Sequence, residues 1–257
     1  MKKLYCLLAI TIALASCKKD FNKPAVVAAK TDTGKEKVNS TLSFSGYTWT
    51  IKDSGTGTAG PGPNYWKGAN SFIDANGYLH LRLSKNTTTN QWQCAEVTST
   101  TNFGYGTYQW QVEGPVSTLD KNIVLGFFNY SGVDGYDEMD IEYAKWGVAT
   151  NPFVGYTVYP AQGASGNFHN ATSFTTSGTY TTNRFKRTST SVVFKAINGF
   201  YDDDTNLAYT TTCSSPAYSI STLSMPVHMN LWLFQGTAPT SDSTVEIIVH
   251  SFKFTAL

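Results

Sequence analysis

The heptapeptide DEMDIEY at residues 137–143 has side chains that alternate in character with a period of two. Glu138, Asp140 and Glu142 fall on one side of an extended chain, and the apolar residues between them fall on the other. This alternation predicts a half-buried β-strand whose apolar face packs into a core. The three carboxylates then stand in a row, roughly 6 to 7 Å apart along the backbone.

Such a row of carboxylates is costly, which suggests that it serves a function. Asp and Glu are depleted in strands, and like charges this close disfavour full ionisation, so at least one pKa should rise. A raised-pKa acid beside an ionised carboxylate is the pair of groups used in glycoside hydrolysis. The alternatives are a solvated strand face and a calcium site built from Asp134, Asp137 and Glu138.

The rest of the chain after residue 43 has the pattern of an all-β protein. Residues 78–83 alternate, and the Asn-Gly pairs at 76–77 and 198–199 are strong turn signals. Short β-rich runs are separated by Gly, Asn, Ser and Thr clusters, and no long segment has a 3.6-residue period. Periodicity therefore predicts a β-sandwich or a β-barrel.

The N-terminal part has a different composition from this domain. Residues 1–17 combine two lysines with a short apolar run, which is typical of a signal peptide and too short for a transmembrane helix. The sequence LASC at 14–17 resembles a bacterial lipoprotein processing box and predicts lipidation of Cys17; an ordinary signal peptide with an incidental Cys is the alternative. Residues 18–43 are expected to form a flexible tether, and 44–257 the folded domain. We expect a lipid-anchored or secreted protein of the bacterial cell envelope.

Charge and cysteine content narrow the classes of partner. The 257 residues carry a net charge of +1, which gives no case for nucleic acid binding. Contact with a membrane is expected only through the N-terminal lipid. Once Cys6 and Cys17 are assigned to the N-terminal segment, Cys94 and Cys213 remain, and these two cannot build a zinc site. We expect them to be dispensable for the fold.

Several stretches, taken in order, resemble glycoside hydrolase family 16, as found in lichenases, laminarinases and xyloglucan transglycosylases. The pattern Glu-x-Asp-x-Glu at 138–142 matches the signature of that family. Further similarity lies in CAE at 94–96, YGTY at 105–108, VLGFFNY at 124–130 and MNLW at 229–232. The resemblance covers roughly residues 60–257. It implies a jelly-roll sandwich of two antiparallel sheets with a concave substrate groove.

The resemblance also implies roles for individual residues. Glu138 corresponds to the nucleophile, Asp140 to the assisting carboxylate and Glu142 to the acid/base. Residues 227–233 alternate, with His228, Asn230 and Trp232 on one face, where an aromatic ring beside polar groups suits a sugar. The resemblance puts Asn230 and Trp232 in the groove and adds Glu96 and Tyr159 as substrate-binding residues; Tyr136 is a further stacking candidate.

Two departures from the family pattern affect the substrate-binding positions. Lichenases have an Arg where this chain has Thr98, and the Gln and Asn that commonly follow the signature are replaced by Gly155 and Thr157. The second departure concerns the acceptor side, near the acid/base. We expect a monomeric, retaining endo-glycosidase that hydrolyses a mixed-linkage β-1,3-1,4-glucan or a β-1,3-glucan. It is expected to require no cofactor, and a structural calcium ion stays an open alternative. Transglycosylation and a non-catalytic carbohydrate-binding jelly roll are the alternatives.

Overall fold

The computed structural model describes residues 40–257, and these residues form two antiparallel β-sheets. The expected signal peptide at 1–17, Cys17 and most of the expected tether lie outside the described residues. Strand β1 begins at Ser40, the first described residue, and pairs with β2 from Ser40 to Phe44, so it includes residues that we expected in the tether. Only Leu42 and Phe44 are apolar in this strand, so its pattern alone did not separate it from the tether.

The first sheet carries the strand of the acidic heptapeptide, and we call it the groove sheet. Every strand in it is antiparallel to its neighbours. In spatial order it contains β11 (Phe168–Thr172), β10 (Val154–Tyr159), β9 (Glu138–Ala144), β8 (Ile123–Tyr130), β15 (Met225–Leu233), β6 (Trp92–Phe103), β2 (Tyr47–Ile51) and β1 (Ser40–Phe44).

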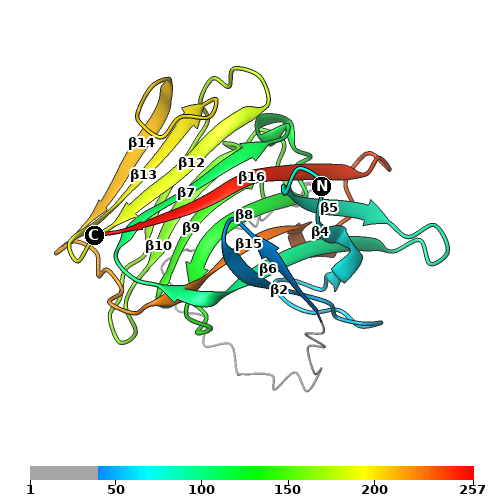
Figure 1. The fold of residues 1–257 in the computed structure, drawn as a ribbon, viewed down its shortest axis with the longest axis horizontal. Helices are drawn as coiled ribbons and strands as arrows, with labels where there is room; N and C mark the ends of the chain where they lie inside the picture. Colours follow the sequence, from blue (N-terminus) through cyan, green and yellow to red (C-terminus); the bar gives the residue numbers. More distant parts are fainter. Residues whose placement is uncertain (1–39) are drawn as a thin grey trace, which may run out of the picture. The chain divides into compact units, whose positions relative to one another are not determined.

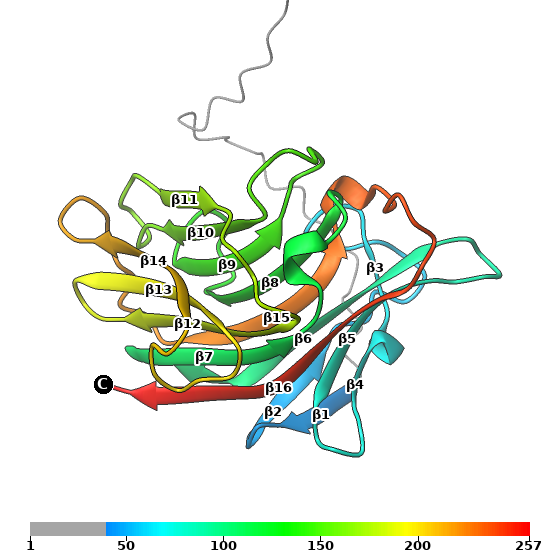
Figure 2. The same cartoon turned by 90° about the horizontal axis from the view of Figure 1, so that it is seen from above.

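The second sheet, which we call the outer sheet, lies against the first (Figure 1 and Figure 2). In spatial order it contains β4 (Ser71–Ile73), β5 (Leu79–Lys85), β16 (Val245–Ala256), β7 (Gly106–Glu113), β12 (Tyr180–Arg187), β13 (Ser191–Asn198) and β14 (Leu207–Ser214). Strands β5 and β6 pair with each other at one end, which joins the two sheets into one hydrogen-bonded path.

Short elements complete the described part of the chain. Strand β3 (Tyr65–Trp66) adds to β6 in parallel. Residues 40–257 contain three 3-10 helices, η1 (Gly68–Asn70), η2 (Val116–Thr118) and η3 (Phe234–Gly236). At the predicted Asn-Gly turn between β4 and β5, Gly77 has a φ of +83°, which an L side chain rarely adopts. No helix within residues 40–257 has the length and apolar character needed to cross a membrane.

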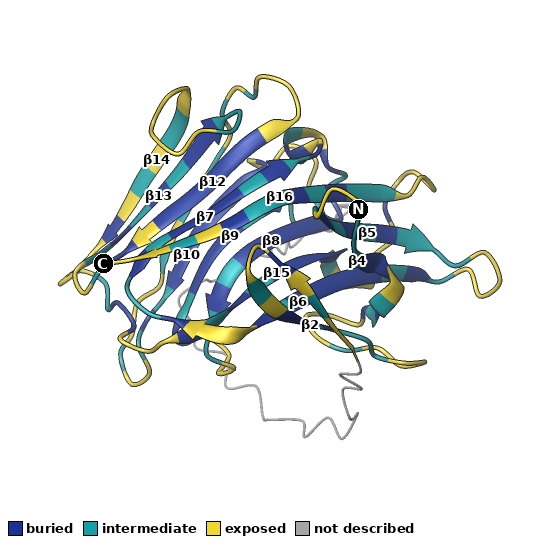
Figure 3. Cartoon of the chain, viewed as in Figure 1, coloured by how far each residue is buried: buried dark blue, intermediate teal, exposed yellow. Residues whose placement is uncertain are grey.

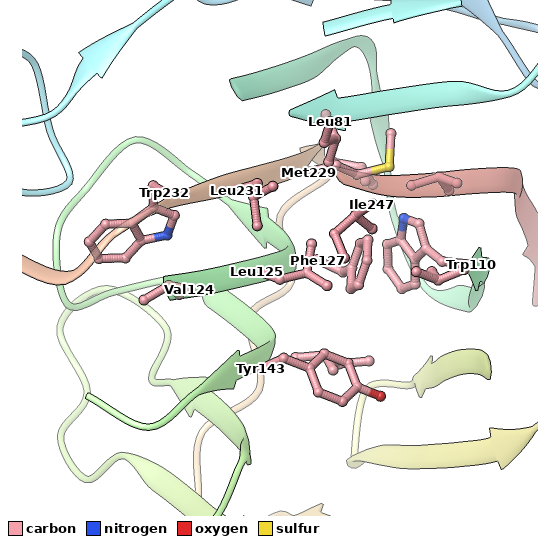
Figure 4. Packing of buried hydrophobic residues seen from close by; sticks show 14 of the residues in the cluster. Leu81, Trp110, Val124, Leu125, Phe127, Tyr143, Met229, Leu231, Trp232 and Ile247 are labelled. Carbon is pink, nitrogen blue, oxygen red and sulfur yellow. The ribbon is translucent and has the colours of Figure 1, made fainter. Parts of the chain in front are cut away.

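The core lies between the two sheets and is rich in aromatic side chains. Trp110 of the outer sheet lies 5.6 Å from Phe127 of the groove sheet, measured between ring centroids, and Figure 4 shows this contact. The Tyr143 hydroxyl donates a hydrogen bond of 2.6 Å to Asn183 Oδ1 of the outer sheet. Buried residues dominate the central strands, whereas exposed residues gather in the loops and on edge strand β14 (Figure 3). The expected all-β sandwich is confirmed.

Candidate active site

Strand β9 positions the three carboxylates as the alternation predicted. Its apolar positions, Met139, Ile141 and Tyr143, are fully buried in the core. Because successive side chains of a strand point to opposite faces, Glu138, Asp140 and Glu142 project from the face of the groove sheet that is turned away from the core. The three lie directly opposite Tyr130, Phe128 and Gly126 on β8, and opposite Tyr159, Thr157 and Gly155 on β10.

A groove of about 960 Å³ opens on this face of the sheet. A groove of this size is in the range that proteins use for small-molecule and oligosaccharide-sized ligands. Strands β9, β8, β15, β6 and β2 form its floor, and loops at 60–62 and 131–134 form its rim. Its lining includes Thr50, Lys52, Glu96, Thr98, Phe128, Tyr130, Asp134, Glu138, Asp140, Glu142, His228, Asn230 and Trp232.

Burial and mutual repulsion raise the pKa of all three carboxyl groups on β9. Burial raises the pKa of Glu142 to about 7. Burial, followed by the charge of Glu142, raises the pKa of Glu138, while a hydrogen bond with Asp140 acts in the opposite direction. Asp140 is fully buried, and burial together with both glutamates raises its pKa well above the usual range. Asp140 and Glu138 therefore share a proton through their hydrogen bond.

Glu142 stands between two glycines, so neither neighbouring strand places a side chain of its own directly beside it. Gly126 and Gly155 are its direct partners on the neighbouring strands. A Cβ on Gly126 would lie 2.5 Å from Oδ1 of Asn230, so the Asn230 amide already fills the space above Gly126. This Oδ1 is buried and has no hydrogen-bond partner among the described residues. Asn230 thus brings a buried acceptor to the same side as Glu142.

A second group of ionisable residues, Lys52, Glu96 and His228, lies on the β6 side of the groove. Lys52 Nζ lies 3.3 Å from Glu96 Oε2, and His228 Nδ1 lies 3.5 Å from Glu96 Oε1 and 3.0 Å from Thr98 Oγ1. Burial alone would raise the pKa of Glu96, but the hydrogen bond with His228 and the charge of Lys52 outweigh it and lower that pKa. His228 also stacks on Phe128, with ring centroids 4.8 Å apart.

Sequence reasoning missed Lys52, which lies one residue beyond β2. It points over the ring of Trp66, 4.4 Å from the centroid, and lines the groove. The available signal was the alternation of residues 49–52, in which Thr50 and Lys52 share the polar face. This lysine supplies a cation next to Glu96 in a chain that has Thr98 where an Arg was expected from the resemblance.

Of the other predicted substrate-binding residues, Trp232 lines the groove, whereas Tyr159 and Tyr136 do not. Trp232 lines the groove although it is only 7% exposed, and its ring lies 6.3 Å from that of Trp146. Tyr159 pairs with Glu138 but does not line the groove. Tyr136 lies in the loop before β9, outside the lining, where its backbone carbonyl accepts a hydrogen bond from Ser131 Oγ.

The remaining sequence-based expectations concern thiols and metal ligands. Cys94 and Cys213 are both buried free thiols, and burial raises the pKa of each to about 12. Within residues 40–257, no three His, Cys, Asp or Glu side chains are grouped as metal ligands. In the loop considered for calcium, Asp137 Oδ2 accepts a hydrogen bond from the backbone N–H of Gln162.

The arrangement of strands is shared with β-glucanases of known structure. A β-glucanase of Bacillus licheniformis matches with a TM-score of 0.63 and 21% identity, over 86% of this chain and 97% of the other. A glycoside hydrolase family 16 endo-glucanase from Bacteroides ovatus, solved in complex with G4G3G-2F-DNP, matches with a TM-score of 0.59 and 14% identity, over 80% and 94%.

A third match comes from a protein described as a pseudo β-1,3-glucanase. This immunostimulatory antigen of Mycobacterium tuberculosis gives a TM-score of 0.58 and 18% identity, over 78% of this chain and 88% of the other. Neither the family models nor the curated proteins searched gave a match. The structural similarities show that this chain has the glycoside hydrolase family 16 fold, in which both glucanases and a pseudo-glucanase occur.

Proposed function

We propose that this protein is a retaining endo-β-glucanase of glycoside hydrolase family 16. The observation that carries the proposal is the row of Glu138, Asp140 and Glu142 on the groove face of β9, in the fold of the β-glucanases. Glu138 attacks the anomeric carbon, and Glu142 gives its proton to the leaving oxygen. Water then attacks the covalent intermediate while Glu142 acts as base.

The hydrogen bonding of the site supports this division of roles. The order of the pKa values runs the other way, because burial and the charge of Glu142 raise the pKa of Glu138 to about 8, above that of Glu142. Asp140 is held protonated by burial, and its hydrogen bond favours the charged form of Glu138, which is what a nucleophile needs. Glu142 receives no such hydrogen bond, and burial brings its pKa to about 7, close to the value that suits a general acid. The three protons titrate as one group, so the pH profile reports on the group and not on single residues.

The charge of the groove favours a neutral polysaccharide. Five carboxyl groups line it, at Glu96, Asp134, Glu138, Asp140 and Glu142, against the single lysine Lys52. With Asp140 and Glu142 protonated, Glu96, Asp134 and Glu138 still outnumber Lys52, so a sulfated or uronic acid chain would be repelled. A mixed-linkage β-1,3-1,4-glucan is the leading substrate, and a β-1,3-glucan is the second.

Two further parts of the proposal concern the N-terminus and the assembly state. We propose that Cys17 is lipidated and anchors a monomeric enzyme in the cell envelope through the tether. Replacing Cys17 by Ala should move the protein from the membrane fraction to the soluble fraction. Recovery of the variant with membranes at the wild-type level would contradict the anchor.

The test of the activity is reducing-sugar release from a panel of polysaccharides by residues 40–257. We expect release from mixed-linkage β-glucan or laminarin and none from a sulfated galactan. The similarity to a pseudo-glucanase makes a second outcome concrete. If a glucan is bound but not cleaved under any condition between pH 4 and 9, the protein is a carbohydrate-binding jelly roll and the enzymatic proposal is wrong.

A further inference from the structure

His169 on edge strand β11 lies close to Glu142, although sequence reasoning gave it no role. His169 pairs with Thr157, and Thr157 pairs with Asp140, so all three point to the groove face. The ring leans along the strand: its Cε1 lies 3.3 Å from the position that a Cβ on Gly155 would occupy. Since Gly155 is the direct partner of Glu142, the imidazole is separated from the acid by about one strand spacing, roughly 5 Å.

One nitrogen of the His169 ring has a hydrogen-bond partner, which orients the ring, and the other nitrogen has none within residues 40–257. Nδ1 lies 3.0 Å from Thr157 Oγ1. Within residues 40–257, Nε2 has no hydrogen-bond partner. Partial burial lowers the pKa of His169, which favours the neutral ring. A neutral imidazole with one free nitrogen and an exposed face can bind a sugar hydroxyl or stack on a sugar ring.

The space above Gly155 has a counterpart on the other side of Glu142. There the amide of Asn230 fills the space above Gly126, and the groove continues over β15, β6 and β2. A glucan chain that crosses the strands has sugars on both sides of the bond that Glu142 protonates. The sugars that do not lie over β15 and β6 then extend past Glu142 towards β10 and β11, where the exposed His169 ring covers Gly155 and offers a free polar group.

We propose that His169 forms a binding subsite for the leaving-group sugar. This inference rests on the proposed glucanase activity. In double displacement the leaving sugar and the incoming acceptor occupy the same place, because the second step is the reverse of the first in its geometry. His169 therefore also binds the acceptor sugar when a sugar replaces water, and it sets the ratio of transfer to hydrolysis.

The test compares two substrates that have the same donor portion and differ only in the leaving group. One is a mixed-linkage glucan oligosaccharide with a sugar leaving group, and the other is the aryl glycoside of the same donor portion. His169→Ala should lower kcat/KM about tenfold for the oligosaccharide and leave the aryl glycoside unchanged within error. His169→Gln, which keeps a hydrogen-bonding group, should recover part of the loss. With cellobiose added as acceptor, His169→Ala should also give a lower ratio of transfer to hydrolysis.

His80→Ala is the matched control, because His80 lies on β5 of the outer sheet and pairs with Glu246. His80→Ala should leave kcat/KM unchanged for both substrates. Equal loss on both substrates in His169→Ala, or no loss on either, overturns the subsite while the glucanase proposal stands. If the wild-type protein cleaves neither substrate, the glucanase proposal fails and the subsite fails with it. Thermal melts followed by circular dichroism check that the variants fold. If His169→Ala does not fold, the kinetics of His169→Gln on the two substrates decide whether the subsite exists.

Discussion

The carboxylates of strand β9 and the paired carboxylates on the outer side of the sandwich have opposite environments. On the outer side two acids each contact a cation: Asp202, in the loop between β13 and β14, lies 2.9 Å from Lys253, and Glu246 of β16 lies 2.8 Å from Arg82. On the groove sheet the acids of β9 face one another. The hydrogen bond and charge of Lys253 lower the pKa of Asp202, whereas burial and like charge raise the pKa of Glu138.

This difference separates a stabilising use of charge from a functional one. Paired surface charges favour the folded state by a small amount and perform no chemistry. A buried row of acids costs free energy of folding, and proteins keep such groups where their shifted pKa values are used.

Removal of Glu138 should abolish turnover. Glu138→Ala is expected to lower kcat by roughly three orders of magnitude or more, since no covalent intermediate can form. Added azide should restore part of the reaction and give a glycosyl azide of inverted anomeric configuration. The measurement is reducing-sugar release with product analysis by NMR. Wild-type hydrolysis by Glu138→Ala would refute the role of this residue.

Removal of Glu142 should affect substrates according to their leaving group. Glu142→Ala is expected to lower kcat about 10²- to 10⁴-fold on polysaccharide, because the departing sugar needs a proton. An aryl glycoside with a good leaving group needs none, so its first step should be spared. Steady-state and burst kinetics on both substrates test this. An equal loss on both would show that Glu142 acts in some way other than as the acid.

The stability cost of the row should depend on pH. The folded-state pKa of Glu142 is about 7, above the ordinary value of 4.5, so wild-type stability falls as pH rises through that window. Glu142→Gln removes this titration and should raise Tm relative to wild type at pH 8 but not at pH 4. Each kcal/mol corresponds to roughly 2–4 °C in a domain of this size.

Glu246→Gln on the outer sheet is the control for that experiment. Burial would raise the pKa of Glu246, but hydrogen bonds with His80 and Arg82 lower it overall. A lowered pKa contributes stability above the unfolded-state value and loses it in acid. Glu246→Gln should therefore lose Tm at pH 8 relative to pH 4, the opposite of Glu142→Gln. The same direction in both variants would contradict the contrast between the two faces.

The smallest effect is expected on the outer sheet itself. Asp202→Asn breaks an ion pair whose two side chains are mostly exposed, and such pairs contribute about 0–1 kcal/mol. Melting temperature should change little and kcat/KM on glucan should stay at the wild-type value. A large loss of activity would mean that the outer face takes part in catalysis.

The sequence predicted the parts of this site that depend on alternation within one strand. Met139 and Ile141 are buried as expected, and Asn230 and Glu142 lie on the groove face. Lys52 and His169 were not predicted as site residues, because they reach the site through strand pairings between segments far apart in the sequence. Gly155 matters because the register between β9 and β10 pairs it with Glu142. The local sequence around Gly155 does not predict that register.

The anomeric configuration of the first product is the most direct test of the central claim, that the acids of β9 form a nucleophile and an acid for a retaining reaction. Proton NMR of a wild-type digest of mixed-linkage β-glucan should show the β-anomer first, with the α-anomer appearing only by mutarotation. Release of the α-anomer first would contradict the covalent intermediate on Glu138. Glucan binding without any new reducing end would contradict catalysis altogether.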